Sequence, residues 1–124
     1  MCTGLNMEIP ELKLSYLAAP YSDPSIDVVE KRMEKLCKVD AILMKQGIFT
    51  VSPLLKHFIV RHADLPTDYK FWKDYSDTLL CAVDQLIVLM LDGWKESIGV
   101  TAEIKLAKDL GIPVVYVDED GNFV

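Results

Sequence analysis

The sequence predicts an α/β fold in which helices cover both faces of a mostly parallel sheet, that is, a three-layer sandwich. Two observations predict this class. Apolar runs of strand length alternate with helical patterns along the 124 residues, and this alternation is typical of β-α-β units. Residues 86–91 are continuously apolar, as expected for a central parallel strand covered on both faces. With no repeat or linker in between, we expect residues 1–124 to form one domain.

The first half of the chain predicts two strands joined by a long helix. Residues 12–20 should form the first strand, ending in a small-residue turn. The helix should begin after a cap at Asp23 or Ser25 and stop at Gly47. Residues 48–53 predict a second short strand, and residues 54–63 are either a short helix or part of a longer loop. The helix should bury one face, formed by Ile26, Val29, Met33, Leu36, Val39 or Asp40, and Leu43.

The second half predicts two more helices and two more strands. One helix should begin after Thr67 or Asp68, lead into the central strand, and bury Phe71, Trp72, Tyr75, Leu79 and Ala82. A further helix over residues 100–111 precedes a last strand at residues 113–117. Its apolar arc should consist of Val100, Ile104, Leu106, Ala107 and Leu110. The order β-α-β-(α)α-β-α-β predicts a flavodoxin-like or Rossmann-like sheet.

Composition and charge exclude several classes of function. A net charge of −6 without a Lys/Arg-rich stretch argues against binding to a nucleic-acid backbone. Cys2, Cys37 and Cys81 have no C-x-x-C spacing, which favours a reducing compartment over a disulfide scaffold. Neither a signal sequence nor an apolar run long enough to cross a membrane is recognisable. We therefore expect a soluble, cytoplasmic protein that does not act at a membrane.

Glu103 stands out because it lies near the middle of an apolar helical arc. In a parallel sheet, ligands bind outside the carboxyl ends of the strands. The turns at residues 18–24, 50–57 and 91–99 should meet at that edge, with Glu103 about one turn into the following helix. Glu103 could be a rim residue paired with a basic neighbour, or a partly buried carboxylate acting as nucleophile or base. Ser97, Gly99 and the free amides of the helix start could support the second role.

Several other polar or aromatic residues can be explained by an ordinary structural role as well as by a functional one. Ser22 and Asp23 fit an ordinary capped turn, and Tyr16 fits the core as well as a pocket. Trp94 could stack on a flat base. His57 and His62 have no third ligand at metal-like spacing, so we expect solvent-facing histidines and no metal site. Asp74, Ser76 and Asp77 should lie on a solvated helix face, although one of them could reach the pocket because this helix leads into the central strand. Neither G-x-G-x-x-G nor a P-loop occurs.

Three segments together resemble the nucleoside 2-deoxyribosyltransferase superfamily: YLAAPYS at residues 16–22, SIGVTAE at residues 97–103, and IKLAKDLGIPV after it. The motifs are closest to the nucleoside 5'-monophosphate N-glycosidase branch and to small uncharacterised bacterial and phage relatives. The resemblance implies Glu103 as nucleophile at C1' of the sugar. It also implies an assisting carboxylate, for which Asp77 is the nearest match and Asp74 the fallback.

The resemblance further implies a set of substrate-binding positions. Ser97, where many transferases have Asp, favours the hydrolase-like branch and its 5'-phosphate contact. In that branch the first turn carries Gly and Arg, whereas this chain has AAPYSD with Ser22 near the place of the Arg, a departure that leaves phosphate recognition open. Family members assemble as dimers or larger oligomers, so Asn122 is a candidate to reach a neighbour's site. The expected binding residues are Tyr16, Ala19, Tyr21, Ser22, Trp94, Ser97, Gly99 and Asn122.

These implications predict an enzyme that cleaves the N-glycosidic bond of a nucleoside or nucleotide through Glu103, without metal or organic cofactor. Water would complete a hydrolase, and a second base would complete a transferase. Two alternatives remain: a non-catalytic nucleotide-binding sensor of the same fold, and an enzyme that cleaves NAD or phosphoribosyl compounds. The sequence leaves open the base, the sugar and the need for a 5'-phosphate.

Overall fold

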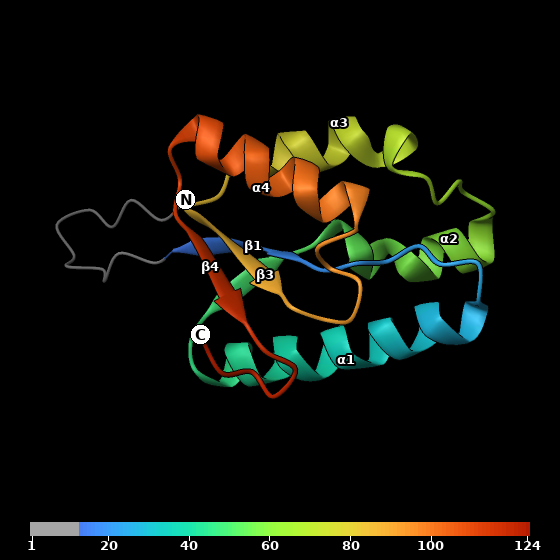
Figure 1. Cartoon of the computed structure of the whole chain (residues 1–124), viewed down its shortest axis with the longest axis horizontal. Coiled ribbons are helices and arrows are strands. Elements are labelled where there is room, and N and C mark those ends of the chain that lie inside the picture. The colour runs from blue at the N-terminus through green and yellow to red at the C-terminus, as the bar shows by residue number, and fades with distance from the viewer. Residues whose placement is uncertain (1–12) are drawn as a thin grey trace, which may run out of the picture.

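A computed structural model describes residues 13–124, which contain four parallel strands and the helices between them (Figure 1). The order of strands and helices expected from the sequence is confirmed. The four strands are parallel and lie in the sheet in the order β2-β1-β3-β4. Cys2 and Leu12 lie outside the described residues. The strands are β1 (Leu14–Ala18), β2 (Phe49–Val51), β3 (Gln85–Leu89) and β4 (Val114–Val117). The helices are α1 (Ile26–Lys45), a 3-10 turn η1 (Pro53–Lys56), α2 (His57–Ala63), α3 (Tyr69–Leu80) and α4 (Ile98–Leu110).

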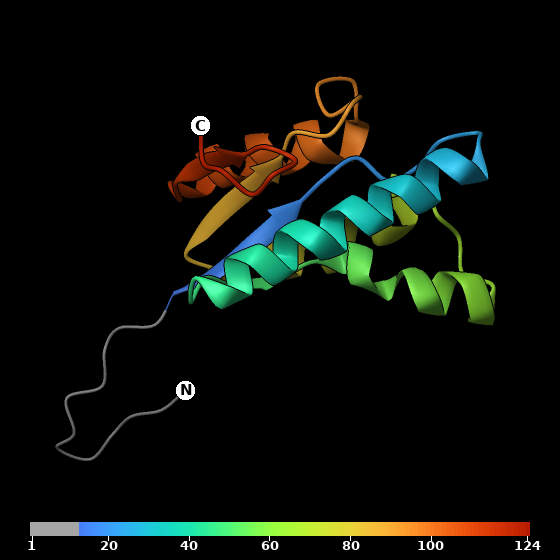
Figure 2. The same cartoon turned by 90° about the horizontal axis from the view of Figure 1, so that it is seen from below.

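The sheet divides the core into two layers of packing, as expected for the three-layer α/β sandwich. Alternation along β1 sends Leu17 toward α1 and the buried Tyr16 toward α3 and α4. Figure 1 shows α1 on one side of the sheet and α3 with α4 on the other, and Figure 2, seen from below, shows α1 running along β1. The apolar strand β3 lies between β1 and β4, and its Leu86–Leu89 segment is fully buried, which confirms its central place.

Helix α1 begins after Ser25 and ends at Lys45, before Gly47 with φ of +80°. This agrees with the predicted cap and glycine stop. The buried face is Val29, Met33, Leu36, Val39 and Leu43, so Val39 rather than Asp40 faces the sheet. The prediction for Ile26 was wrong: it is 58% exposed, because the first helical turn extends beyond the edge of the sheet (Figure 1).

The buried face of α3 differs from the prediction. Ser76 and Leu80 are buried, whereas Phe71 and Tyr75 are exposed and Ala82 lies on the surface beyond the helix. The helix is turned so that its small hydroxyl residue, rather than its aromatic residues, packs over β1. The expectation that Ser76 belongs to a solvated face was therefore wrong. A buried hydroxyl is tolerated here because the Tyr16 hydroxyl of β1 lies within hydrogen-bonding reach of it.

Helix α4 starts two residues earlier than expected and ends before Gly111, which has φ of +74°. Val100 and Ala107 are buried, and Ile104 and Leu106 pack against the same core. Leu110 was wrongly placed in the buried arc, since it is 43% exposed at the last turn. No helix in residues 13–124 combines the length and apolarity needed to span a bilayer.

Candidate functional site

A cavity of about 630 Å³ opens at the carboxyl edge of the sheet. The first turn (residues 18–23), the segment after β2 and the loop before α4 all line it, together with the start of α3. This confirms that the three strand-end turns meet at one edge. The order β2-β1-β3-β4 places β1 and β3 side by side while their connections leave toward opposite faces, the arrangement that opens a crevice in parallel sheets.

Glu103 lies in the wall of this cavity and is held by the strand beneath it. The buried hydroxyl of Tyr16 donates a hydrogen bond to Glu103 Oε2. Tyr16 is on β1 and Glu103 is on the second turn of α4, so the contact joins the sheet to the helix at the cavity wall, which both residues line. The arrangement keeps one carboxylate oxygen oriented by Tyr16 and leaves the other for a ligand.

The protein raises the pKa of Glu103 from 4.5 to about 7. Burial is the main cause; the hydrogen bond from Tyr16 lowers the pKa, and the negative charge of Asp77 raises it. Burial and the charge of Glu103 in turn raise the pKa of Tyr16, while hydrogen bonding to Ser76 lowers it. Tyr16 therefore stays protonated and donates to Glu103. A carboxyl group that titrates near neutrality inside a cavity is typical of functional sites.

The carboxylates of α3 are arranged differently from the expectation. Asp77 pairs with Lys73 at 2.5 Å, and Asp74 is exposed; neither is part of the cavity wall. Asp77 still lies close enough to raise the pKa of Glu103. Asp68, at the N-cap of α3, lines the cavity instead and makes no side-chain hydrogen bond to its own helix. Sequence reasoning identified Asp68 only as a helix cap.

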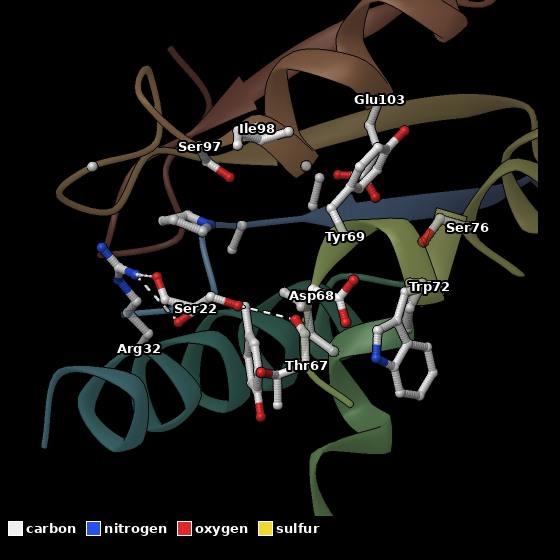
Figure 3. Close-up of a pocket in the computed structure, with 18 of the residues that line it drawn as sticks. Ser22, Arg32, Thr67, Asp68, Tyr69, Trp72, Ser76, Ser97, Ile98 and Glu103 are labelled. Carbon is white, nitrogen blue, oxygen red and sulfur yellow. Dashed lines mark hydrogen bonds between the residues drawn. The ribbon is translucent and has the colours of Figure 1, made fainter. Parts of the chain in front are cut away.

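Tyr69 is a cavity residue that sequence reasoning missed, and Ser76 is the one of the three polar residues Asp74, Ser76 and Asp77 that lines the cavity. Figure 3 shows the Tyr69 ring beside Glu103, with Ser76 and Asp68 on the α3 side of the cavity. Burial raises the pKa of Tyr69, as do the charges of Asp77 and Glu103. A side chain at Gly99 would lie 3.7 Å from the Tyr69 ring, so α4 and α3 are in close contact there. The helical spacing of Tyr69, Trp72 and Ser76 (i, i+3, i+7) was the available signal.

Ser97 caps α4, as its place in the sequence suggested. Its Oγ accepts a hydrogen bond from the Val100 amide at 3.2 Å, and the residue also lines the cavity. Ala19, Tyr21, Ser22 and Gly99 line it as well. Ser22 Oγ donates to the Thr67 carbonyl at 3.1 Å, which ties the first turn to the segment before α3 (Figure 3).

Arg32 on α1 connects two of the cavity loops. Its Nη1 donates to the Tyr21 and Ser22 carbonyls at 3.2 and 2.9 Å, and its Nη2 donates to the Asp92 carbonyl at 3.2 Å. Figure 3 shows the guanidinium reaching the first turn. Arg32 thus places a guanidinium in the cavity wall near Ser22, although the first turn itself carries no Arg. Sequence reasoning missed it because it lies ten residues farther along, on a helix.

Gly93→Ala should destabilise the protein by about 2 kcal/mol, because Gly93 combines backbone strain with a blocked side-chain position. Its φ is +89°, and a Cβ there would lie 2.8 Å from Arg32 Nη2. Urea denaturation provides the measurement. Gly47→Ala is the matched control: its φ is +80° with no atom within 4 Å, so it should cost about 1 kcal/mol through strain alone. Equal losses for both variants would contradict the role of the Arg32 contact.

His57 does not face solvent, contrary to the sequence expectation. Its side chain is 10% exposed and lines the cavity, hydrogen-bonded to Tyr21 and Glu30. His62 is exposed and stacks on Phe58. The difference arises because Tyr21 of the first turn and Glu30 of α1 hydrogen-bond the His57 ring from its two nitrogens. Within residues 13–124, His, Cys, Asp and Glu form no cluster of three or more suited to a metal ion.

Trp94 and Asn122 lie away from the cavity wall. The Trp94 ring packs against Tyr116, 5.6 Å between centroids, and joins the core on the α4 side. We expected Trp94 to offer a stacking surface in the cavity. Instead, the loop turns the indole toward β4, and Trp94 is not part of the cavity wall. Asn122 is exposed near the C-terminus, where its backbone pairs with Asp118. Its expected contact with a neighbouring subunit stays a prediction.

Comparison with known proteins gives one family and one fold. The model of a family described as a domain of unknown function, DUF1937, matches residues 13–119. No curated protein matches the chain. Among solved structures, a 2-deoxyribosyltransferase from the psychrotolerant bacterium Bacillus psychrosaccharolyticus is similar, with a TM-score of 0.59 and 19% identity. The likeness covers 90% of this chain and 76% of that one, and at this identity it shows a shared fold.

Proposed function

We propose that this chain, which belongs to the DUF1937 family, cleaves the N-glycosidic bond of a nucleoside or nucleoside 5'-monophosphate. The observation that carries the proposal is Glu103, a cavity carboxyl group with a pKa of about 7 that is oriented by the Tyr16 hydroxyl. The fold shared with a 2-deoxyribosyltransferase supports the choice of nucleosides as substrates. We take residues 1–124 as one domain of this type, working without a cofactor.

In the proposed reaction, ionised Glu103 attacks C1' of the sugar as the bond to the base breaks. The bonding electrons leave with the base, and positive charge develops on the sugar in an oxocarbenium-like transition state. Glu103 stabilises this charge and forms a glycosyl ester. Water then releases the sugar in a hydrolase, or a second base takes it in a transferase. Low solvent access around the carboxylate strengthens its attraction to the developing cation.

The departing base needs a proton, and two carboxylates are candidates to supply it. Asp68 lines the cavity near Tyr69 and has no capping bond to restrain it, which supports a direct role as general acid. Asp77, the residue suggested by the motif, pairs with Lys73 and acts on Glu103 through its charge. We therefore propose Asp68 as the proton donor and Asp77 as a residue that tunes Glu103.

The remaining cavity residues support binding of the sugar and its 5' side. Ser97 and Gly99 at the start of α4 and Ser22 on the first turn line the cavity together with Arg32. Hydroxyl groups, free amides and a guanidinium suit a hydroxyl or phosphate group on the substrate. A homo-oligomer in which Asn122 of a neighbouring subunit contributes to the site remains part of the proposal.

The activity should depend on pH through Glu103. Because the nucleophile must be ionised, the limb of kcat/KM that reports on Glu103 should rise about tenfold per pH unit below 7. Loss of the proton from the proposed acid Asp68 should give a separate limb that falls with pH. Tyr16→Phe removes the hydrogen bond that lowers the pKa of Glu103, so the rising limb should move to higher pH. Initial rates between pH 5 and 9 give both profiles. An unchanged limb in Tyr16→Phe would contradict the assigned contact.

The function is tested by incubating the protein with a panel of nucleosides and nucleoside 5'-monophosphates, with and without a second free base. Chromatography follows released base and newly formed nucleoside. We expect free base from at least one substrate; exchange with the second base would identify a transferase. Turnover of NAD or of phosphoribosyl compounds alone would replace the proposal by that activity. Binding without any release would favour a nucleotide sensor.

A further inference from the structure

Tyr21 and His57 form a hydrogen-bonded pair in the cavity wall. Tyr21 Oη lies 2.6 Å from His57 Nδ1, and the two rings meet edge to face with centroids 5.6 Å apart. On its other side, His57 Nε2 lies 3.0 Å from Glu30 Oε2. The same carboxylate oxygen accepts from Arg61 at 2.5 Å. The imidazole is therefore held at both nitrogens, between α1 and the first turn.

When His57 is neutral, this network fixes which atom carries each proton. Although burial acts to raise the pKa of Glu30, hydrogen bonding from His57 and the charge of Arg61 lower it below its ordinary value. Glu30 is thus a carboxylate that can only accept. A neutral His57 must then carry its hydrogen on Nε2 and present a lone pair at Nδ1. Tyr21 donates its single hydroxyl hydrogen to that lone pair.

The consequence for a ligand is that Tyr21 can only accept. Burial and the charge of Glu30 raise the pKa of Tyr21, so the phenol stays protonated with its hydrogen committed to His57. The apolar residues Pro53, Leu54 and Val60 line the same cavity. A ligand N–H or O–H that reaches the pair finds an acceptor, whereas a carbonyl oxygen there finds only a lone pair and loses its hydrogen bond to water.

We propose that Tyr21 determines substrate specificity by selecting a hydrogen-bond donor, either an amino group of the base or a hydroxyl of the sugar. His57 and Glu30 are positioning residues that hold Tyr21 in this accepting role. The inference rests on the proposed function, because it assumes that a nucleoside or nucleotide occupies the cavity. It adds to that function the polarity of the group that the substrate must present.

The test measures binding to protein carrying Glu103→Gln, so that turnover does not interfere. Calorimetry at pH 8 gives dissociation constants for matched 5'-monophosphates: cytidine against uridine, adenosine against inosine, and each ribonucleotide against its 2'-deoxy and 3'-deoxy forms. We expect that one hydrogen-bond donor of the nucleotide, an amino group or a sugar hydroxyl, weakens binding about tenfold when it is replaced or removed. A difference between cytidine and uridine or between adenosine and inosine nucleotides identifies a donor on the base. A difference between a ribonucleotide and its deoxy forms identifies a donor on the sugar.

Variants of the pair decide whether Tyr21 is responsible. Tyr21→Phe should reduce the tenfold preference to less than about twofold. His57→Leu and Glu30→Ala should also reduce it, because Tyr21 then regains a free hydrogen or His57 can exchange tautomers. Glu30→Ala should disturb the fold less than His57→Leu, since the Glu30 side chain is 43% exposed. His62→Asn, on the exposed face of the same helix, is the control and should keep the preference.

The outcomes separate this inference from the proposed function. Equal binding of all donor and acceptor partners, or a preference that persists in Tyr21→Phe, overturns the role of Tyr21 while leaving the function intact. A preference lost in Tyr21→Phe but unchanged in Glu30→Ala overturns the positioning role of Glu30. Failure of the whole panel to bind counts against the proposed function itself.

Discussion

Glu103→Gln is expected to reduce the rate of base release at pH 8 by about 1,000-fold or more, with binding of the substrate retained. Gln keeps the size of the side chain and an oxygen that can accept from Tyr16. It removes the negative charge that stabilises the oxocarbenium-like transition state and the nucleophilic oxygen that forms the ester. The measurement is single-turnover base release at saturating substrate, followed by chromatography.

Glu34→Gln is the matched control for this prediction. Glu34 is exposed on α1, outside the cavity wall, and the same substitution there should leave the rate unchanged. Mass spectrometry after rapid acid quenching should detect a protein–sugar adduct in the parent protein and none in Glu103→Gln. Base release that continues in Glu103→Gln or Glu103→Ala at the parental rate would remove Glu103 from the role of nucleophile.

The sequence predicted the layer architecture because hydrophobic periodicity reports directly on burial. The continuous apolar run of β3 required cover on both faces, and the buried positions of α1 followed a clear helical stripe. Errors fell at element ends, such as Ile26 and Leu110, because a periodic pattern does not reveal where a helix extends beyond the sheet. The strand-end turns could be placed together because parallel strands share a carboxyl edge.

The rotation of α3 was beyond the reach of periodicity. Its aromatic residues outnumber the small ones, so the pattern assigned Phe71 and Tyr75 to the core. In the fold, the neighbouring polar pair of Tyr16 and Glu103 makes a place for the Ser76 hydroxyl on the inner face. Local hydrophobicity gives no weight to such a long-range polar contact. Asp68 and Tyr69 were not recognised as cavity residues for the same reason.

Glu103 could be singled out from sequence because it interrupts an apolar arc, and its place in the cavity wall agrees with the reading of a partly buried carboxylate. Arg32 and His57 could not be recognised as cavity residues from the sequence. Their contribution depends on long side chains that reach across from α1 and α2 to loops far away in sequence. Neither belongs to a local motif, so only the packed structure brings them to the cavity.

Glu103→Gln is also expected to stabilise the folded protein above neutral pH, by about 2 kcal/mol. A carboxyl pKa raised from 4.5 to about 7 means that the fold favours the protonated form. Stability linked to Glu103 is therefore fully present below pH 4.5 and is lost as pH rises to about 7. The full shift corresponds to about 3 kcal/mol, which we reduce to about 2 kcal/mol because Glu103 as a whole residue is only partly buried. Gln remains neutral throughout and avoids this loss.

Urea denaturation of the parent protein and Glu103→Gln at pH 5 and pH 8 measures the effect. The difference in the free energy of unfolding should be small at pH 5, reach about 2 kcal/mol at pH 8, and remain constant above pH 8. Glu34→Gln should show no such growth with pH, because its side chain is exposed. A difference that is the same at both pH values would mean that Glu103 titrates as an ordinary carboxyl group. The burial that raises the pKa of Glu103 would then be absent. The proposed nucleophile would carry no cost in folding stability of the kind expected at a functional site.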